Sequence, residues 1–343
     1  MSSLQAGRQS FYLPHPPVIS AWASVVGKRE GDGPLGRSFD AVFPDPYLGQ
    51  PSFEQAERAM QQTVLRRLLR KAGCIPEELG VVFSGDLLNQ CIVSSFALRN
   101  SGIPQMGLYG ACSTMAQALV LGAMTVGGGF AKKAAAMTSS HFCAAERQYR
   151  FPLGYGGQRT PTSQWTVTGA GAALLSSAGK GPRIRSCTIG SVRDLGLQDM
   201  NNMGCCMAPA ALSTIQAHFR DLGSCPADYD LILTGDLGQL GKDMLLELAS
   251  RQGLQLGGRI ADCGCLIYDN TRQKVGSGGS GAGCSAAVLC GEILNRVSSG
   301  KLKRILFCGT GALLSPLSAQ QKLPIPGICH AVEIVSPELE ETT

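Results

Sequence analysis

The sequence predicts an α/β protein made of two similar halves, and three observations lead to this fold class. Apolar runs of strand length alternate with helical segments, which is typical of a parallel or mixed sheet with helices on its faces. A shift of 172 residues aligns Cys112 with Cys284, each before a predicted helix. Glycine accounts for 44 of the 343 residues, and two of its clusters precede these helices. Because such repeats indicate duplicated units, we expect halves at residues 1–178 and 179–343.

In the first half, the opening fifty residues are expected to be irregular, because turn signals rich in Gly and Pro occur at residues 31–34 and 44–46. A helix is predicted over residues 53–72. Ser52 is a suitable N-cap for this helix, and Gly73 is a suitable stop. The other elements predicted here are a strand at 79–83, a short helix, a strand at 105–109, a long helix from about residue 113 and a strand at 132–138.

The second half is expected to repeat this order. Its first strand, over residues 231–233, is followed by Thr-Gly-Asp, as the strand over residues 79–83 is followed by Ser-Gly-Asp. In both halves a glycine-rich turn then leads into a helix. The strand after that helix is preceded by a basic residue and ends at a threonine, Thr138 in the first half and Thr310 in the second.

Composition and charge exclude several classes of protein. Apolar residues make up 44% and charged residues 16% of the chain, whereas disordered chains are poor in apolar residues and rich in charge. The net charge is only +5 and no long basic run occurs, so no nucleic-acid partner is expected. The uncharged stretch 100–131 holds polar residues and glycines, and it is predicted as a strand and a buried helix rather than a membrane span.

The 14 cysteines are expected to be reduced and mostly buried. The N-terminus carries prolines and charges without the apolar stretch of a signal peptide, which indicates a reducing compartment. No Cys-x-x-Cys pair occurs, and Cys263 and Cys265 lack the spacing of tetrahedral zinc ligands. We therefore predict no metal site.

Cys112 is the first candidate for chemistry, since it lies in the turn between a predicted strand and a predicted helix. Backbone N–H groups and the dipole at a helix N-terminus favour a thiolate, and they can bind an oxyanion or a carboxylate. Cys112 is thus either a reactive or ligand-binding residue or a small residue buried in a crowded turn.

The segment from Thr138 to His141 is the second candidate, because ligands of open α/β sheets bind beyond the carboxyl ends of strands. A histidine there, beside a cysteine at a helix start, could act as the base for the Cys112 nucleophile. The alternative is that His141 is a solvated loop residue. Two roles are also considered for His330: a group of the pocket, or a residue at a strand end.

The long segment over residues 142–165 is the third candidate, because loops of this length in compact domains are often functional. Its arginines can clamp carboxylates in bidentate geometry, and its aromatic rings can stack on a planar ligand. These side chains are Arg147, Arg150, Arg159, Tyr149, Phe151 and Tyr155. The alternative is a surface loop or a dimer contact with solvated arginines.

Residues 276–281 fit the dinucleotide pattern G-x-G-x-x-G. Lys301 stands about 20 positions further on, however, where a nicotinamide site needs an acidic residue. We therefore predict a glycine-lined pocket wall and no nicotinamide cofactor.

A set of motifs spread over residues 20–335 resembles one protein family. They are Gly33-Pro34-Leu35-Gly36, Gly85-Asp86-Leu87-Leu88-Asn89-Gln90, Phe130-Ala131-Lys132-Lys133, Thr138-Ser139-Ser140-His141, Ala145-Glu146-Arg147-Gln148, Tyr155-Gly156-Gly157-Gln158 and Gly309-Thr310-Gly311-Ala312-Leu313-Leu314-Ser315-Pro316. Two α/β halves with a cysteine at the start of the third helix resemble the thiolase and ketoacyl-synthase superfamily. Within it, the motifs are similar to those of the stage V sporulation protein AD family.

The resemblance implies a thiolase-like, five-layer α-β-α-β-α architecture. It also implies a protein that binds dipicolinic acid, as its calcium chelate, for uptake into the developing bacterial spore. Such a protein would be a homodimer, peripherally attached to the spore inner membrane through membrane proteins of the same operon. Calcium would arrive with the ligand, and no cofactor is implied. The residues expected to bind the ligand are Cys112, Ser139, Ser140, His141, Arg147, Gly311 and His330.

Departures from the enzymes of the superfamily favour a binding protein without catalysis. Thiolases carry a histidine where this chain has residues 280–282, and ketoacyl synthases carry one where it has Gly235-Asp236. Condensation needs a base within hydrogen-bond reach of the nucleophile. The alternative is a cysteine-dependent acyltransferase, ketoacyl-synthase-like or thioesterase enzyme, with Cys112 as the nucleophile and His141 as the base.

Overall fold

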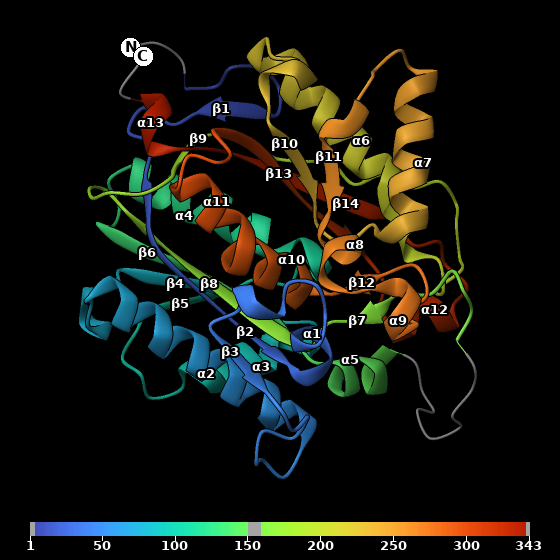
Figure 1. Ribbon diagram of the computed structural model, residues 1–343, viewed down its shortest axis with the longest axis horizontal. Helices are drawn as coiled ribbons and strands as arrows, with labels where there is room; N and C mark the ends of the chain where they lie inside the picture. The colour runs from blue at the N-terminus through green and yellow to red at the C-terminus, as the bar shows by residue number, and fades with distance from the viewer. Residues whose placement is uncertain (1–3, 150–158, 341–343) are drawn as a thin grey trace.

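The computed structural model describes residues 4–149 and 159–340, and strands from both halves of the chain join one 12-stranded sheet (Figure 1). One part of the sheet has the strand order β2-β8-β6-β4-β5, and the other has the order β11-β10-β13-β14-β9. The first part consists of β2 (Val18–Gly27), β4 (Val81–Gly85), β5 (Gln105–Gly107), β6 (Lys133–Ser140) and β8 (Gly169–Ser176). The second part consists of β9 (Arg183–Thr188), β10 (Leu231–Thr234), β11 (Ile260–Asp262), β13 (Arg304–Ala312) and β14 (Gly327–Val335). The two parts meet where Val18 of β2 pairs with Arg183 of β9.

Helices cover the outer faces of both parts and fill the space between them (Figure 1). On the outside, α2 (Phe53–Ala72) packs on β2, β6 and β8, and α6 (Met203–Leu222) packs on β13 and β14. Between the two parts, α4 (Thr114–Gly127) contacts β4 and β6 as well as β13 and β14, and α10 (Ala282–Val288) packs on β6 and β8. The predicted α/β class with five layers is therefore confirmed.

The helix predicted over residues 53–72 is confirmed at both ends. The side chain of Ser52 caps the first turn by accepting a backbone hydrogen bond of 3.3 Å, and Gly73 ends the helix in the left-handed conformation at φ 57°. Met60, Val64 and Leu68 are four residues apart and fully buried, so they form the face that packs on the sheet.

The prediction of an irregular N-terminal stretch was wrong. Residues 18–27 form β2, a ten-residue strand between β8 and β9 at the centre of the sheet. Ser20 and Ser24 interrupt the apolar residues of this strand, so the Gly and Pro turns that follow it were the stronger local signal. Two short strands also lie in this region: β1 (Ser10–Tyr12) pairs with β9, and β3 (Ala41–Phe43) pairs with β2.

The remaining predicted strands correspond to β4, β5, β6 and β10, and the long helix corresponds to α4. The further elements are α1 (Lys28–Gly31), α3 (Ile92–Leu98), α5 (Phe142–Tyr149), β7 (Trp165–Thr166), α7 (Gly238–Arg251), α8 (Cys263–Ile267), α9 (Asn270–Gln273), β12 (Gly279–Ser280), α11 (Leu294–Ser298), α12 (Pro316–Gln320) and α13 (Pro337–Glu340). The division at residues 178 and 179 stays a prediction. In the described part of the chain, no helix has the length and apolar character needed to cross a bilayer.

Candidate ligand pocket around Cys112

A cavity of about 60 Å³ lies beside Cys112, where segments from both halves of the chain meet. Its described lining consists of Leu87, Ala111, Cys112, Ala145, Glu146, Tyr149, Thr166, Met200, Met203, Ser280, Ala312 and Leu314. Most of these side chains are apolar, and Glu146 is the charged one among them. Because a water molecule takes up ~30 Å³ in the liquid, the cavity has room for about two waters.

A tight turn holds Cys112 at the start of α4. The turn is a short 3-10 helix, Ala111–Ser113, and Ala111 has a positive φ of 52°. The hydroxyl of Ser113 donates a 2.6 Å hydrogen bond to the Gly110 carbonyl oxygen. Behind the turn, a Cβ on Gly311 would lie 2.9 Å from that same oxygen. Gly311 thus supports the turn through close backbone packing and does not line the described cavity.

Asp236 is a residue that sequence reasoning did not select, and it faces Cys112. It follows β10 and is completely buried. Its carboxylate accepts hydrogen bonds from Ser280 Oγ (3.0 Å), from the Gly281 backbone N–H (2.9 Å) and from Thr310 Oγ1 (2.9 Å). The Ser280 oxygen in turn lies 4.0 Å from the Cys112 sulfur. Three donors therefore hold the carboxylate against the thiol.

These surroundings determine the protonation of Cys112. Burial raises the pKa of the thiol well above its usual value, and the neighbouring Asp236 carboxylate raises it further. The thiolate expected at a helix start is thus disfavoured, because burial and a like charge outweigh the helix dipole. The signal for Asp236 was present in the repeat, since Asp86 follows β4 in the same way. Asp86 is also buried and accepts hydrogen bonds from the Ser94 backbone and hydroxyl.

Ser139 and Ser140 do not line the described cavity. The Ser139 hydroxyl donates a 2.7 Å hydrogen bond to Glu57 of α2 and accepts one of 2.8 Å from Gln61. The Ser140 hydroxyl points to the other face of β6, where it donates to the Val167 carbonyl (2.6 Å). It also accepts from the Gly283 backbone N–H (3.1 Å), so Ser140 connects β6 to the start of α10.

His141 lies in a different cavity, of about 360 Å³, which is also lined by Arg29, Phe142 and Trp165. It is buried rather than solvated, with 1% of its surface exposed. Its Nε2 lies 2.8 Å from the Pro46 carbonyl oxygen, and burial lowers the pKa of the ring. The structure contains no hydrogen bond between His141 and Cys112, both of which it describes.

The described lining of the Cys112 cavity also lacks Arg147, Arg159 and His330. Arg147 is half-exposed and lies 3.4 Å from Glu54. His330 accepts a 3.2 Å hydrogen bond from the Gly190 backbone, and burial lowers its pKa to about 4. Arg159 reaches the cavity wall indirectly, because its guanidinium lies 3.0 Å from Glu146.

Three predicted side chains, Arg150, Phe151 and Tyr155, lie outside the described residues. Of the seven residues predicted to bind the ligand, Cys112 alone lines the described cavity. Across residues 4–149 and 159–340, no group of three His, Cys, Asp or Glu side chains converges to hold a metal ion.

Solved structures with similar folds include a 3-oxoacyl-[acyl-carrier-protein] synthase III and OleA. A 3-oxoacyl-[acyl-carrier-protein] synthase III from Aquifex aeolicus VF5 superposes with a TM-score of 0.55 at 13% identity, over 93% of this chain and 99% of that one. A variant of OleA from Xanthomonas campestris gives a TM-score of 0.61 at 13% identity, over 94% and 99% of the two chains. At this level of identity the likeness shows a shared thiolase-like fold.

Sequence comparison is more specific. Residues 7–335 match the family described as Stage V sporulation protein AD (SpoVAD). The chain is 42% identical over 326 residues to the Stage V sporulation protein AD of Bacillus subtilis (strain 168), which covers 95% of this chain and 96% of that protein. The chain therefore belongs to the Stage V sporulation protein AD family.

Proposed function

We propose that this sporulation protein binds dipicolinic acid, as its calcium chelate, for uptake into the developing spore, and that it does so without catalysis. Membership of the Stage V sporulation protein AD family supports the role in sporulation. The observation that carries the absence of catalysis is the position of Asp236 beside the Cys112 thiol. The turn that carries the cysteine is retained, whereas the residue facing the thiol is a carboxylate whose negative charge disfavours the thiolate.

The Cys112 environment suits a neutral thiol. A cysteine nucleophile reacts as the thiolate and needs a base or a positive neighbour that lowers its pKa. Here a thiolate would form in a buried site next to a carboxylate, and no histidine is within hydrogen-bond distance of the thiol among the described residues. A neutral thiol can still contact a bound ligand, so the same turn can serve in binding.

The ligand would have to enlarge the cavity, because about 60 Å³ is less than a pyridine ring with two carboxylates occupies. Met200 and Met203 line one wall, and their thioether side chains can change rotamer easily. Tyr149 is held more firmly, since its hydroxyl donates a 2.6 Å hydrogen bond to the Leu87 carbonyl oxygen. We therefore expect a flat slot that opens on the methionine side and accepts a planar ring.

Calcium bound to the ligand also suits the charge of this cavity. Free dipicolinate carries two negative charges at neutral pH, whereas its calcium chelate is neutral. Glu146 is the charged side chain of the described lining, and it lies 3.0 Å from Arg159. A neutral chelate avoids repulsion from Glu146 and Asp236, and the calcium would be held by the ligand rather than by a protein cage.

Calorimetric titration with calcium dipicolinate tests the proposal. Wild-type protein is expected to bind saturably at micromolar to millimolar ligand. Ala145→Leu fills the cavity from α5 and is expected to weaken binding at least about tenfold, the loss of ~1.4 kcal/mol. Leu317→Ser is the matched control, since Leu317 is 62% exposed and lies outside the cavity. A wild-type titration without saturable heat, or equal affinity in Ala145→Leu, would contradict the proposal.

The proposal includes attachment to the spore inner membrane through membrane proteins of the same operon, and a homodimer. Support for the dimer comes from β5, the last strand of its part of the sheet, whose outer edge pairs with no other described strand. Met106 on this strand is 56% exposed, and Tyr109 just beyond it is 49% exposed. Light scattering should give twice the monomer mass for wild type and the monomer mass for Met106→Asp.

A further inference from the structure

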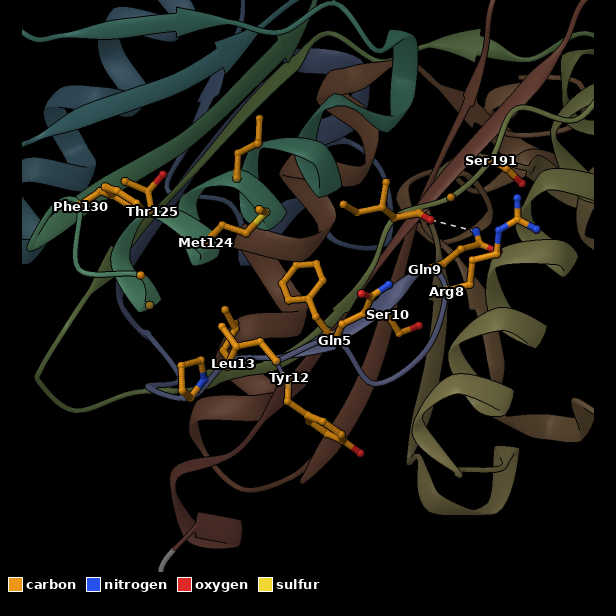
Figure 2. Close-up of a pocket in the computed structure, with 18 of the residues that line it drawn as sticks. Gln5, Arg8, Gln9, Ser10, Tyr12, Leu13, Met124, Thr125, Phe130 and Ser191 are labelled. Carbon is orange, nitrogen blue, oxygen red and sulfur yellow. Dashed lines mark hydrogen bonds between the residues drawn. The ribbon is translucent and has the colours of Figure 1, made fainter. Parts of the chain in front are cut away.

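A second and much larger cavity, of about 1020 Å³, is a groove between the N-terminal segment and the end of α4 (Figure 2). Residues 4–14 form one wall, residues 121–130 form another, and residues 189–193 close it. None of its described lining residues belongs to the described lining of the Cys112 cavity. Cys112 precedes the first residue of α4 and the groove lies at its last turn, about 21 Å along a helix of 14 residues.

The two ends of the groove differ in chemistry. Figure 2 shows Met124, Thr125 and Phe130 at one end and Arg8, Gln9 and Ser191 at the other. Phe130 is 88% exposed at the mouth of the apolar end. Gly127 and Gly128 allow close packing at this end: a Cβ on Gly127 would lie 3.1 Å from Leu13, and one on Gly128 would lie 2.7 Å from the Met124 carbonyl oxygen.

The charge of the described lining is entirely positive. Arg8 and Arg193 are its charged residues, both are exposed, and no acidic side chain lines the groove. Arg193 is held in place because its guanidinium donates two hydrogen bonds to Ser213 Oγ, at 3.0 and 2.8 Å, and it forms no ion pair with any described residue. The nearby carboxylate of Asp221 is already engaged, since it pairs with Arg220 and accepts hydrogen bonds from Gln9 N and Ser10 Oγ.

The dipole of α4 also favours a negatively charged group at the arginine end of the groove rather than at the apolar end. The C-terminal end of α4 carries partial negative charge, and it lies beside Met124 and Gly128 at the apolar end. An anionic group is therefore disfavoured at that end and favoured at the end with the arginines. A ligand that fits both ends has an apolar chain and one negatively charged head.

We infer that this groove binds an anionic amphiphile, a molecule with an acyl chain and a carboxylate or phosphate head. The acyl chain of the ligand lies along Leu13, Leu121 and Met124 towards Phe130, and its charged head lies between Arg8 and Arg193. The volume is at the upper end of the range for small-molecule sites, and apolar walls with a few placed charges are typical of them. Such an amphiphile is available as a free fatty acid or as an anionic phospholipid of a bilayer.

Titration with three soluble probes tests this inference on the full chain. Dodecanoate, kept below its micelle concentration, is expected to bind saturably with one site per chain. Butyrate has the same carboxylate head but lacks the long acyl chain, and it is expected not to bind. Dodecanol has the chain without the charge and is expected to bind about tenfold more weakly than dodecanoate.

Variants then assign the site. The double variant Arg8→Gln/Arg193→Gln is expected to weaken dodecanoate about tenfold and to leave dodecanol unchanged, whereas Phe130→Ser weakens both probes. Arg272→Gln and Leu317→Ser are matched controls on exposed residues outside the groove and are expected to bind like wild type. Failure of dodecanoate to bind, equal affinity of dodecanol, or wild-type affinity in the double variant overturns the inference.

Sedimentation with vesicles identifies the source of the amphiphile. Binding to phosphatidylglycerol vesicles but not to phosphatidylcholine vesicles, lost in the double variant, supports a bilayer lipid. Binding of dodecanoate without binding to either vesicle supports a free fatty acid. Calcium dipicolinate affinity is expected to be unchanged in all groove variants, so the result is independent of the proposal for the Cys112 cavity.

Discussion

The thiol of Cys112 lies beside the buried carboxylate of Asp236, and the hydroxyl of Ser280 contacts both side chains. This carboxylate is held by three hydrogen bonds, so it is a fixed part of the site rather than a mobile neighbour. A fixed negative charge at this place keeps the sulfur protonated, whereas a histidine there could take the proton and pair with the thiolate. The same turn at the start of a helix can therefore belong to a catalyst or to a binding site, depending on the residue that faces it.

The first prediction concerns the reactivity of Cys112. Because burial and Asp236 both raise the pKa of its thiol, we expect iodoacetamide at pH 8 to alkylate Cys112 at least about tenfold more slowly than a free thiol. Asp236→Asn removes the charge, lowers the thiol pKa and is expected to speed the reaction. Peptide mapping by mass spectrometry measures both rates.

Cys225 supplies the internal standard for this measurement, since it is exposed in the same chain. A Cys112 that reacts as fast as Cys225 would show that its thiolate is readily formed. Covalent labelling of Cys112 by an acyl-thioester would point to the same conclusion and would favour the acyltransferase or thioesterase alternative.

The second prediction concerns the close approach of Gly283 to β6 and β8. A Cβ at this position would lie 2.2 Å from the Gly169 carbonyl oxygen and 2.7 Å from Ser140 Oγ. Gly283→Ala must therefore move the start of α10, and we expect it to lower the free energy of unfolding by about 1–3 kcal/mol. Urea unfolding measures the change. Gly258→Ala is the matched control, because its Cβ would meet no atom within 4 Å, and a loss of stability equal to that of Gly283→Ala would contradict the packing argument.

Much of the fold follows from local patterns in the sequence. The cap at Ser52 and the stop at Gly73 define α2, and the repeated segments that end in Asp86 and Asp236 mark equivalent strands. β2 was not predicted because the Gly and Pro turn signals of the first fifty residues outweighed its own mixture of apolar residues and serines.

The site could be predicted only in part, because side-chain direction and loop packing depend on the tertiary structure. Cys112 was identified by its place in the chain. Ser139 and Ser140 point to opposite faces of β6, as neighbouring residues of a strand do, so they cannot both face one pocket. His141 is enclosed by the loop that carries Pro46, which is distant in sequence.

The third prediction concerns acid stability and His218. This side chain is completely buried between the hydroxyls of Thr188 and Tyr229, and burial lowers its pKa to about 3. A histidine with an ordinary pKa of ~6.5 takes up its proton in the unfolded chain first, so stability is lost as the pH falls below ~6.5. The slope for one proton is about 1.4 kcal/mol per pH unit. We expect the urea midpoint to fall less between pH 7 and pH 5 in His218→Gln than in wild type.

His15→Gln serves as the control for this series, because His15 is exposed. It is expected to keep the wild-type dependence on pH. An unchanged slope in His218→Gln would show that other groups cause the acid sensitivity.

The fourth prediction concerns stability at alkaline pH and Glu57, a residue on the buried face of α2 with 1% of its surface exposed. Burial raises the pKa of its carboxyl well above the usual value, and the nearby Asp86 raises it further. The folded protein therefore holds a proton that the unfolded chain releases at ~pH 4.3, so stability is lost as the pH rises through the raised pKa. Glu57→Gln keeps an oxygen that can accept the Ser139 hydrogen bond but has no proton to lose. We expect its unfolding midpoint to change less between pH 5 and pH 9 than that of wild type and to exceed the wild-type value at pH 9.

Glu77→Gln is the control, because Glu77 is exposed, and it is expected to follow the wild-type curve. A Glu57→Gln curve parallel to that of wild type would mean that Glu57 does not titrate with folding.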